Sequence, residues 1–282
     1  MPYTLVVFHA HPDDEALLTS GTMARASAEG HRVVLVVATA GGVGLVGSDF
    51  LGEGESLAAR RLAELRRSAT ALGCARTEVL GYADSGLAGA ARPDAARPEG
   101  GSVAFAAADV HEAAQRLADL LVAERADVLT TYDPAGGYGH PDHVQVHHVG
   151  VLAAELAGTP VVLEATVDRD LITRALRLVR RVYRFPPEFD PTVFNRAYTP
   201  RSQLTHRVDV RRYAIRKRTS MAAHASQATA DGADRTLAAF LRLPTPLFRR
   251  VFGQEWYVER GRTPGGPLLD DIFASLRGGE PR

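Results

Sequence analysis

Two short clusters of histidine and aspartate contain the side chains of this sequence that are best suited to chemistry. Ala-His-Pro-Asp-Asp-Glu at residues 10–15 follows the apolar run 3–8, and His-Pro-Asp-His at residues 140–143 follows the apolar run 126–132. Imidazole nitrogens and carboxylate oxygens are both zinc ligands, whereas they make poor core residues. The two clusters therefore indicate a metal site.

His11 and Asp14 are three residues apart at the end of a strand pattern, a spacing that lets both side chains converge on one point. One more neutral ligand would complete the three-ligand arrangement of catalytic zinc sites, in which the fourth position is left for water. His140 and His143 are spaced in the same way, and either could supply that ligand. Such a donor set also accepts iron(II) or cobalt(II).

The remaining polar residues of the two clusters fit the other roles of metal-assisted hydrolysis. Asp13 lies beside the expected metal without being needed as a ligand, so it can take a proton from the attacking water. The histidine of the second cluster that does not bind metal could stabilise an oxyanion, or protonate a leaving amine if it is cationic. Asp142 can orient one of its neighbouring histidines through a hydrogen bond. We therefore expect a metal hydrolase, with a metal-free binding module as the alternative.

The pattern of apolar runs predicts a parallel sheet that brings the two clusters to one edge. Residues 3–8 and 32–38 are unbroken apolar runs, and the helical pattern of residues 15–28 between them completes a βαβ unit. The alternation continues to residue 165 and predicts a Rossmann-like α/β fold with helices on both faces of a mostly parallel sheet. Ligands of such sheets bind at the carboxyl ends of the strands, where both clusters lie.

The chain is expected to form one domain with a C-terminal extension. Residues 1–165 would form the catalytic core, and residues 166–282 would complete the domain and the substrate pocket. The arginines near residues 174–184 are interpreted as a solvated helix face, or as a surface for an anion or a partner. Further strands are expected at residues 77–80, 128–132, 160–165, 204–208 and 255–259, and further helices at residues 55–72, 106–125, 144–156, 171–184 and 210–227.

Composition excludes several classes of partner. The 33 basic and 33 acidic residues give no net charge that would attract nucleic acid or an anionic membrane. The single cysteine, Cys74, excludes an intrachain disulfide framework and fits a reducing compartment. No stretch approaches the roughly 18 apolar residues of a membrane span, and no signal peptide is recognised. We expect a cytoplasmic protein that acts on a small molecule, with a homo-oligomer left open.

The two clusters, with the residues around them, resemble the LmbE/PIG-L family of zinc-dependent N-deacetylases. The likeness rests on residues 10–15 and on Gly-Gly-Tyr-Gly-His-Pro-Asp-His at residues 136–143. Fainter similarities occur at residues 64–66, at residues 82–86 and in Ala-Ala-His-Ala-Ser-Gln at residues 222–227. The family includes deacetylases and amidases of the mycothiol and bacillithiol pathways, so the resemblance implies a Rossmann-like hydrolase.

The resemblance also implies a role for most of the cluster residues. Asp13 would be the general base, and His140 would support the oxyanion and the leaving amine. Tyr138 would polarise the substrate carbonyl. The implied zinc ligands are His11, Asp14 and His143.

For the substrate, the resemblance implies an acetamido sugar of the N-acetylglucosamine type. Arg66 and Asp84 match positions that contact the sugar in mycothiol-type members. Two relatives of the same chemistry stay open: an amidase of a thiol-sugar conjugate and a deacetylase that tailors a natural product. A metal-free ligand-binding relative is the alternative from another class.

Overall fold

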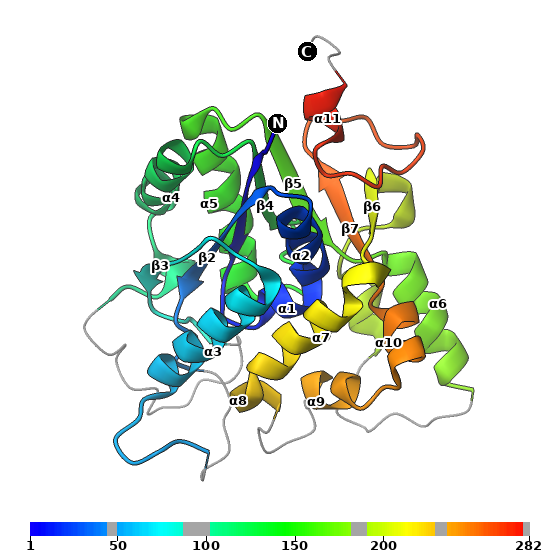
Figure 1. The fold of residues 1–282 in the computed structure, drawn as a ribbon, viewed down its shortest axis with the longest axis horizontal. Coiled ribbons are helices and arrows are strands. Elements are labelled where there is room, and N and C mark those ends of the chain that lie inside the picture. The colour runs from blue at the N-terminus through cyan, green and yellow to red at the C-terminus, as the bar shows by residue number, and fades with distance from the viewer. Residues whose placement is uncertain (44–49, 87–101, 182–190, 229–235, 279–282) are drawn as a thin grey trace.

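The computed structural model describes residues 1–43, 50–86, 102–181, 191–228 and 236–278. Its strands are β1 (Thr4–His9), β2 (Arg32–Thr39), β3 (Arg76–Tyr82), β4 (Val128–Tyr132), β5 (Val161–Thr166), β6 (His206–Asp209) and β7 (Gln254–Glu259). They form one seven-stranded sheet in the order β3-β2-β1-β4-β5-β7-β6 (Figure 1). Strands β1 to β5 are parallel, and β7 and β6 are added antiparallel. The predicted α/β fold with a mostly parallel sheet is confirmed.

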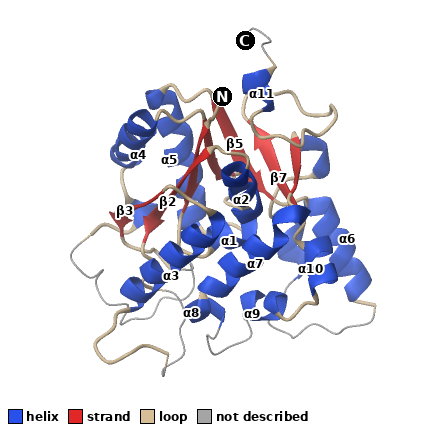
Figure 2. Ribbon diagram, viewed as in Figure 1, coloured by secondary structure: helices blue, strands red, loops and turns tan. Residues whose placement is uncertain are grey.

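Helices cover both faces of this sheet (Figure 2). The helices are α1 (Asp14–Leu18), α2 (Ser20–Ala28), α3 (Leu57–Leu72), α4 (Val110–Glu124), α5 (Pro141–Ala157), α6 (Arg169–Val179), α7 (Ala214–Ala223), α8 (Ala225–Ala228), α9 (Thr236–Leu241), α10 (Thr245–Val251) and α11 (Ala274–Arg277). One core cluster contains residues of α2 and α3, and a second contains residues of α4 and α5. Within the described ranges, none of the helices has the length and apolarity of a membrane span.

Strand β1 lies in the middle of the sheet and is buried on both faces. Leu5 and Val7 belong to the core cluster beneath α2 and α3, whereas Val6 and Phe8 belong to the cluster beneath α4 and α5. Successive side chains of a strand point to opposite faces, so a central parallel strand needs an unbroken apolar run. This is the physical reason why the sequence pattern located the strand correctly.

The segment after β1 corrects one prediction. We expected a single helix over residues 15–28, but the backbone leaves the helical conformation at Thr19, where φ is −132°. The carboxylate of Glu255 accepts hydrogen bonds from the backbone N–H groups of Gly21 and Thr22, at 2.8 and 2.7 Å. It thereby caps a new helix, α2, from a strand more than two hundred positions away in sequence. The sequence of residues 15–28 gives no indication that Glu255 is a partner of this segment.

Further boundaries differ from the prediction, and the basic helix, α6, ends at Val179, earlier than expected. Helix α5 begins at Pro141 rather than at residue 144, because His140 occupies the N-cap and proline is well accommodated at the first helical position. His143 therefore belongs to the first turn of a helix and not to a loop. The helix expected over residues 210–227 is divided at His224, which separates α7 from α8. Of the basic helix expected over residues 171–184, residues 182–184 lie outside the described residues.

A buried ion pair connects the segment after residue 166 to the start of the chain. The Lys217 ammonium donates to Glu255 at 2.5 Å and to the Leu17 carbonyl at 2.8 Å. Lys217 and Glu255 are 1% and 2% exposed. Since Glu255 also caps α2, this pair fixes α7, β7 and the first βα unit against one another.

We expect Lys217→Met to lower the free energy of unfolding by about 3 kcal/mol, because it leaves the Glu255 carboxylate buried without its cation. Denaturation by urea measures the effect. The double variant Lys217→Met/Glu255→Gln should be more stable than the single variant, since it removes the uncompensated charge. A single variant as stable as the parent would contradict the importance of this pair.

Candidate active site

The two clusters meet at the carboxyl ends of β1 and β4. These strands are neighbours, but the chain leaves β1 toward β2 on one side and returns to β4 on the other. Such a reversal of strand order opens a crevice above the sheet, which is where open α/β sheets bind ligands. The convergence expected from the sequence is therefore produced by the topology.

Three side chains of the clusters form a compact donor set. His11 Nδ1 lies 3.5 Å from Asp14 Oδ2, and His143 Nε2 lies 3.4 Å from Asp14 Oδ1. One donor atom from each residue falls within 4.8 Å of the others, a spacing that suits a shared metal ion. His143 Nε2 is buried without a hydrogen-bond partner among the described residues. An orphaned imidazole nitrogen that faces a carboxylate fits a divalent metal, because the ion would satisfy both groups.

His11 is oriented by carboxylates on its far side. Its Nε2 lies 3.0 Å from Asp142 Oδ2 and 3.3 Å from Asp84 Oδ1. A proton on Nε2 leaves the Nδ1 lone pair free to face Asp14, the arrangement typical of metal-binding histidines. Burial by itself lowers the pKa of His11, but its carboxylate partners, Asp14 foremost, raise it well above its ordinary value. The site therefore favours positive charge at this point.

Asp142 orients a different histidine from the one expected. The sequence analysis assigned its carboxylate to one of its two neighbours in the second cluster, whereas the carboxylate contacts His11. Ser85 holds it in place, through a hydroxyl at 2.5 Å and a backbone N–H at 3.0 Å. Asp142 is fully buried, so its contribution is to position His11 rather than to touch a substrate.

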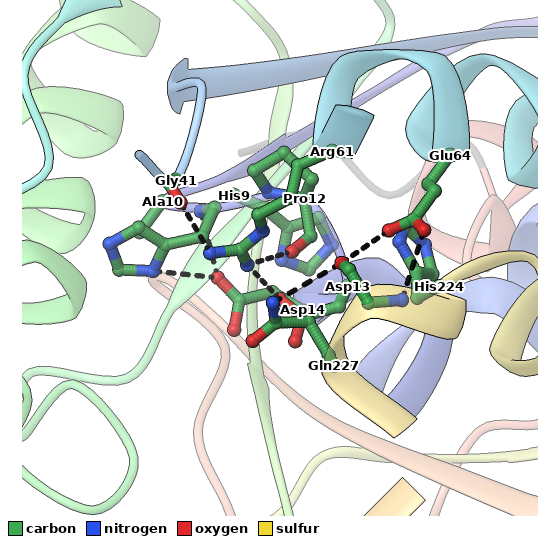
Figure 3. Close-up of polar contacts among 12 residues, drawn as sticks. His9, Ala10, Pro12, Asp13, Asp14, Gly41, Arg61, Glu64, His224 and Gln227 are labelled. Atoms are coloured by element: carbon green, nitrogen blue, oxygen red, sulfur yellow. Dashed lines mark hydrogen bonds and ion pairs between the residues drawn. The ribbon is translucent and has the colours of Figure 1, made fainter. Parts of the chain in front are cut away.

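Asp13 is separated from the donor set by its backbone conformation. Its φ of 100° is left-handed, which is rare for a residue with a side chain. Arg61 Nη2 donates to Asp13 Oδ1 at 2.9 Å and to the Pro12 carbonyl at 2.5 Å, and Arg61 Nη1 donates to the Gly41 carbonyl at 2.8 Å (Figure 3). Burial raises the pKa of Asp13 above its ordinary value, although the Arg61 guanidinium opposes this. A raised pKa makes the carboxylate a stronger base.

His140 faces the donor set as a neutral hydrogen-bond donor. Its Nδ1 accepts from the backbone N–H of Asp142 at 3.1 Å, so the neutral ring carries its proton on Nε2. Its ring centre lies 4.9 Å from that of His11 and 5.0 Å from that of His143. Burial, followed by the neighbouring histidines, lowers the pKa of His140 to about 4. The cationic form, on which the expected protonation of a leaving amine depended, is therefore disfavoured.

Tyr138 stands at the open side of the cluster. It is 45% exposed, and its ring centre lies 5.1 Å from that of His143. Gly136, which begins this turn, has a φ of 62°, and a Cβ there would lie 2.6 Å from the backbone nitrogen of Val144. Partial burial of the side chain, with the nearby carboxylates, raises the pKa of Tyr138, so the phenol keeps its proton and can donate it.

The two residues expected to contact a sugar have different positions. Asp84 lies inside the cluster, beside His11, and also accepts from the Val43 backbone N–H at 3.3 Å. Arg66 is exposed on α3, and within the described residues no hydrogen bond joins its side chain to the cluster. Arg61, on the buried face of the same helix, is the arginine that reaches the site. From the sequence we singled out Arg66 on this helix and not Arg61.

Two other residues near the site were missed. Glu15 is fully buried and accepts a hydrogen bond from the Asp13 backbone N–H at 3.0 Å. His224, also fully buried, lies 2.6 Å from Glu15 through its Nε2. Both belong to segments with a noted likeness, residues 10–15 and 222–227, and that likeness was the available signal.

Comparison with known proteins finds relatives that align with nearly the whole chain. Residues 6–154 match the PIG-L family, described as GlcNAc-PI de-N-acetylase. The chain is 34% identical to the 1D-myo-inositol 2-acetamido-2-deoxy-alpha-D-glucopyranoside deacetylase of Geodermatophilus obscurus, covering 97% of this chain and 98% of that protein. It is also 34% identical to the enzyme of the same name from Acidothermus cellulolyticus, covering 98% of this chain and 96% of that protein.

A solved structure shows the same fold. The N,N'-diacetylchitobiose deacetylase of Pyrococcus horikoshii has a TM-score of 0.55 with this chain at 21% identity, covering 91% of this chain and 83% of that one. At this identity the likeness concerns the arrangement of helices and strands, and it leaves the chemistry to be argued from the site.

We expect the metal-stripped protein to bind one zinc ion per chain and to unfold at a higher temperature when zinc is added, because the ion binds only the folded donor set. His143→Ala should weaken zinc binding by more than about 100-fold, since it removes a ligand rather than a supporting group. Calorimetric titration measures the stoichiometry and affinity of zinc binding, and thermal denaturation measures the unfolding temperature. The matched control is His148→Ala, an exposed position on the same helix. Equal zinc affinity in the two variants would contradict the proposed ligand set.

Proposed function

This chain belongs to the PIG-L family of de-N-acetylases, and on that premise we propose that it hydrolyses the acetamido group of an N-acetylglucosamine-type sugar. The observation that carries the proposal is the close approach of His11, Asp14 and His143 beside a separately oriented Asp13. As first substrate we propose 1D-myo-inositol 2-acetamido-2-deoxy-alpha-D-glucopyranoside, which is named for relatives that align with nearly the whole chain.

The donor set would hold one divalent ion, which we propose to be zinc, with iron(II) or cobalt(II) as alternatives. Bound there, it would supply a Lewis acid that polarises the amide carbonyl and acidifies water. Two imidazoles and one carboxylate are the ligand types of catalytic zinc sites, and the buried Nε2 of His143, which has no hydrogen-bond partner within the described ranges, supports this assignment.

Asp13 is proposed as the group that moves the proton. Water attacks the carbonyl carbon of the acetamido group and gives its proton to the Asp13 carboxylate. When the carbon–nitrogen bond breaks, the same proton passes to the departing nitrogen, leaving a free amine and acetate. Assigning both transfers to Asp13 follows from the low pKa of His140, which disfavours a second acid at this site.

His140 and Tyr138 are proposed to stabilise the carbonyl oxygen as it gains charge. His140 can donate from Nε2 because its Nδ1 already accepts the Asp142 backbone N–H. Tyr138 can donate because its raised pKa keeps the phenol protonated. Donors held in place before the reaction stabilise an oxyanion without having to reorganise.

Contacts with the sugar are proposed from the cluster and from the C-terminal extension. We propose that Asp84 contacts the sugar, as expected from the sequence, since it lies beside His11. Arg66 remains a proposed sugar contact at the exposed side of α3, and we propose that the buried Arg61 positions Asp13. Residues 166–282 are proposed to complete the substrate pocket, in a cytoplasmic enzyme that works on small molecules.

We expect Asp13→Ala to lower kcat by about 10³-fold, because it removes the proton acceptor. Zinc should stay bound, since Asp13 is outside the donor set. Acetate release from the inositol glycoside measures the rate, and Asp119→Ala, an exposed aspartate on α4, is the control. A near-normal rate for Asp13→Ala would exclude Asp13 as the base. Release of a larger acid from an N-acylated thiol-sugar conjugate, without acetate release from the inositol glycoside, would indicate an amidase.

We expect Tyr138→Phe to lower kcat by about 10²-fold, the usual loss when one oxyanion donor is removed. The ring stays in place, so KM and zinc content should change little. Steady-state kinetics with the same glycoside separates the two parameters. An effect on KM alone would instead indicate that the hydroxyl binds the sugar.

A further inference from the structure

A second, fully buried polar cluster links the turn after β1 to α3 and to the end of α7. Glu15 Oε1 accepts hydrogen bonds from His224 Nε2 and from the Ser68 hydroxyl, both at 2.6 Å. The Ser68 hydroxyl lies 2.7 Å from that of Ser220. All four residues have no exposed surface, so none of them can touch a substrate. Any influence on the reaction must pass through another residue.

The other oxygen of Glu15 reaches the backbone of Asp13. Glu15 Oε2 accepts a hydrogen bond from the Asp13 N–H at 3.0 Å, and the φ of Asp13 is 100°. A left-handed backbone is unfavourable for aspartate unless its surroundings hold it there. A hydrogen bond from a charged carboxylate to that N–H is a strong local restraint. Glu15 therefore acts on the conformation that separates Asp13 from Asp14.

We propose that Glu15 and His224 are positioning residues that hold Asp13 in its left-handed conformation. This inference rests on the proposed function, in which Asp13 moves the proton. It assigns a purpose to a buried pair that takes no part in metal binding or substrate contact. It also gives the C-terminal extension a role, because His224 belongs to that part of the chain.

The arrangement of His224 supports this assignment. Its Nδ1 is buried without a hydrogen-bond partner in the described part of the chain, so its polar contact runs through Nε2 to Glu15. Burial by itself lowers the pKa of His224, but the Glu15 carboxylate raises it above its ordinary value. The hydrogen bond from Nε2 offsets part of the cost of burying the Glu15 carboxylate away from water.

The segment that carries His224 is itself fixed against α3. The Ser226 backbone N–H and hydroxyl donate to the two oxygens of Glu64, at 3.0 and 2.6 Å. Glu64 and Ser226 are both fully buried. His224 thus lies at the break between α7 and α8, and its contact with Asp13 runs through the Glu15 carboxylate.

The test compares three variants of the zinc-loaded enzyme. His224→Leu cannot donate to Glu15 and should lower kcat by about 10- to 100-fold with KM and zinc content unchanged, as expected when a supporting group is lost. His224→Gln keeps an N–H donor and should retain more activity. Ser68→Ala removes the second donor and should give a smaller loss of the same kind. The control is His206→Leu, since His206 is a buried histidine on β6, away from the turn after β1.

A double variant separates positioning from a merely structural role. If His224 acts through Asp13, adding His224→Leu to Asp13→Ala should cost no further activity, because the residue being positioned is already gone. A loss that adds to that of Asp13→Ala would overturn the proposal. So would normal kcat in both His224→Leu and Ser68→Ala.

A readout without metal or substrate completes the test. In the metal-stripped protein, the Asp13 amide proton resonance should move upfield in Glu15→Gln and His224→Leu but stay in place in His206→Leu. An unchanged resonance would overturn the proposal even if the rates fall. If His224→Leu does not fold, His224→Gln and Ser68→Ala carry the same comparison. A parent enzyme that releases no acetate while the resonance still moves would refute the proposed function and leave the positioning intact.

Discussion

The left-handed backbone at Asp13 is the constraint on which the rest of the site depends. Asp13 and Asp14 are adjacent and chemically identical, yet one faces Arg61 and the other faces two histidines. An ordinary helical or extended backbone at Asp13 would not produce this divergence together with the immediate start of α1 at Asp14. The proposed roles of Asp13 as base and Asp14 as metal ligand therefore depend on one dihedral angle and on the contacts that maintain it.

Buried charges around that turn are compensated by groups that come from far away in the sequence. Arg61 from α3 meets Asp13, His224 from the end of α7 meets Glu15, and Lys217 from α7 meets Glu255 on β7. The first two pairs join the first βα unit to later elements, and the third reaches it through the Leu17 carbonyl and the N–H groups at the start of α2. Because an unpaired buried charge is strongly unfavourable, these contacts make the geometry of the site depend on correct packing of the C-terminal extension.

The chemistry of this protein is encoded in the site more than in the fold. The overall fold is similar to that of a deacetylase at 21% identity, and at this identity the likeness concerns the fold alone. The narrower conclusion comes from the donor set, from the neutral Nε2–H of His140 and from the family membership of the chain. A reversal of strand order beside β1 supplies the crevice, and the side chains at its edge determine what happens there.

The sequence alone determined the parts that depend on local pattern. Unbroken apolar runs located β1, β2 and β4, and the spacing within residues 10–15 and 140–143 indicated the region of the proposed metal site, with the choice between His140 and His143 left open. Tertiary structure decided the rest, because the partners involved are distant in sequence. The cap that splits the first helix comes from Glu255, and the partner of Asp142 is His11. Likewise, burial singled out Arg61 over Arg66, since helical spacing cannot show which of several arginines lies under a neighbouring loop.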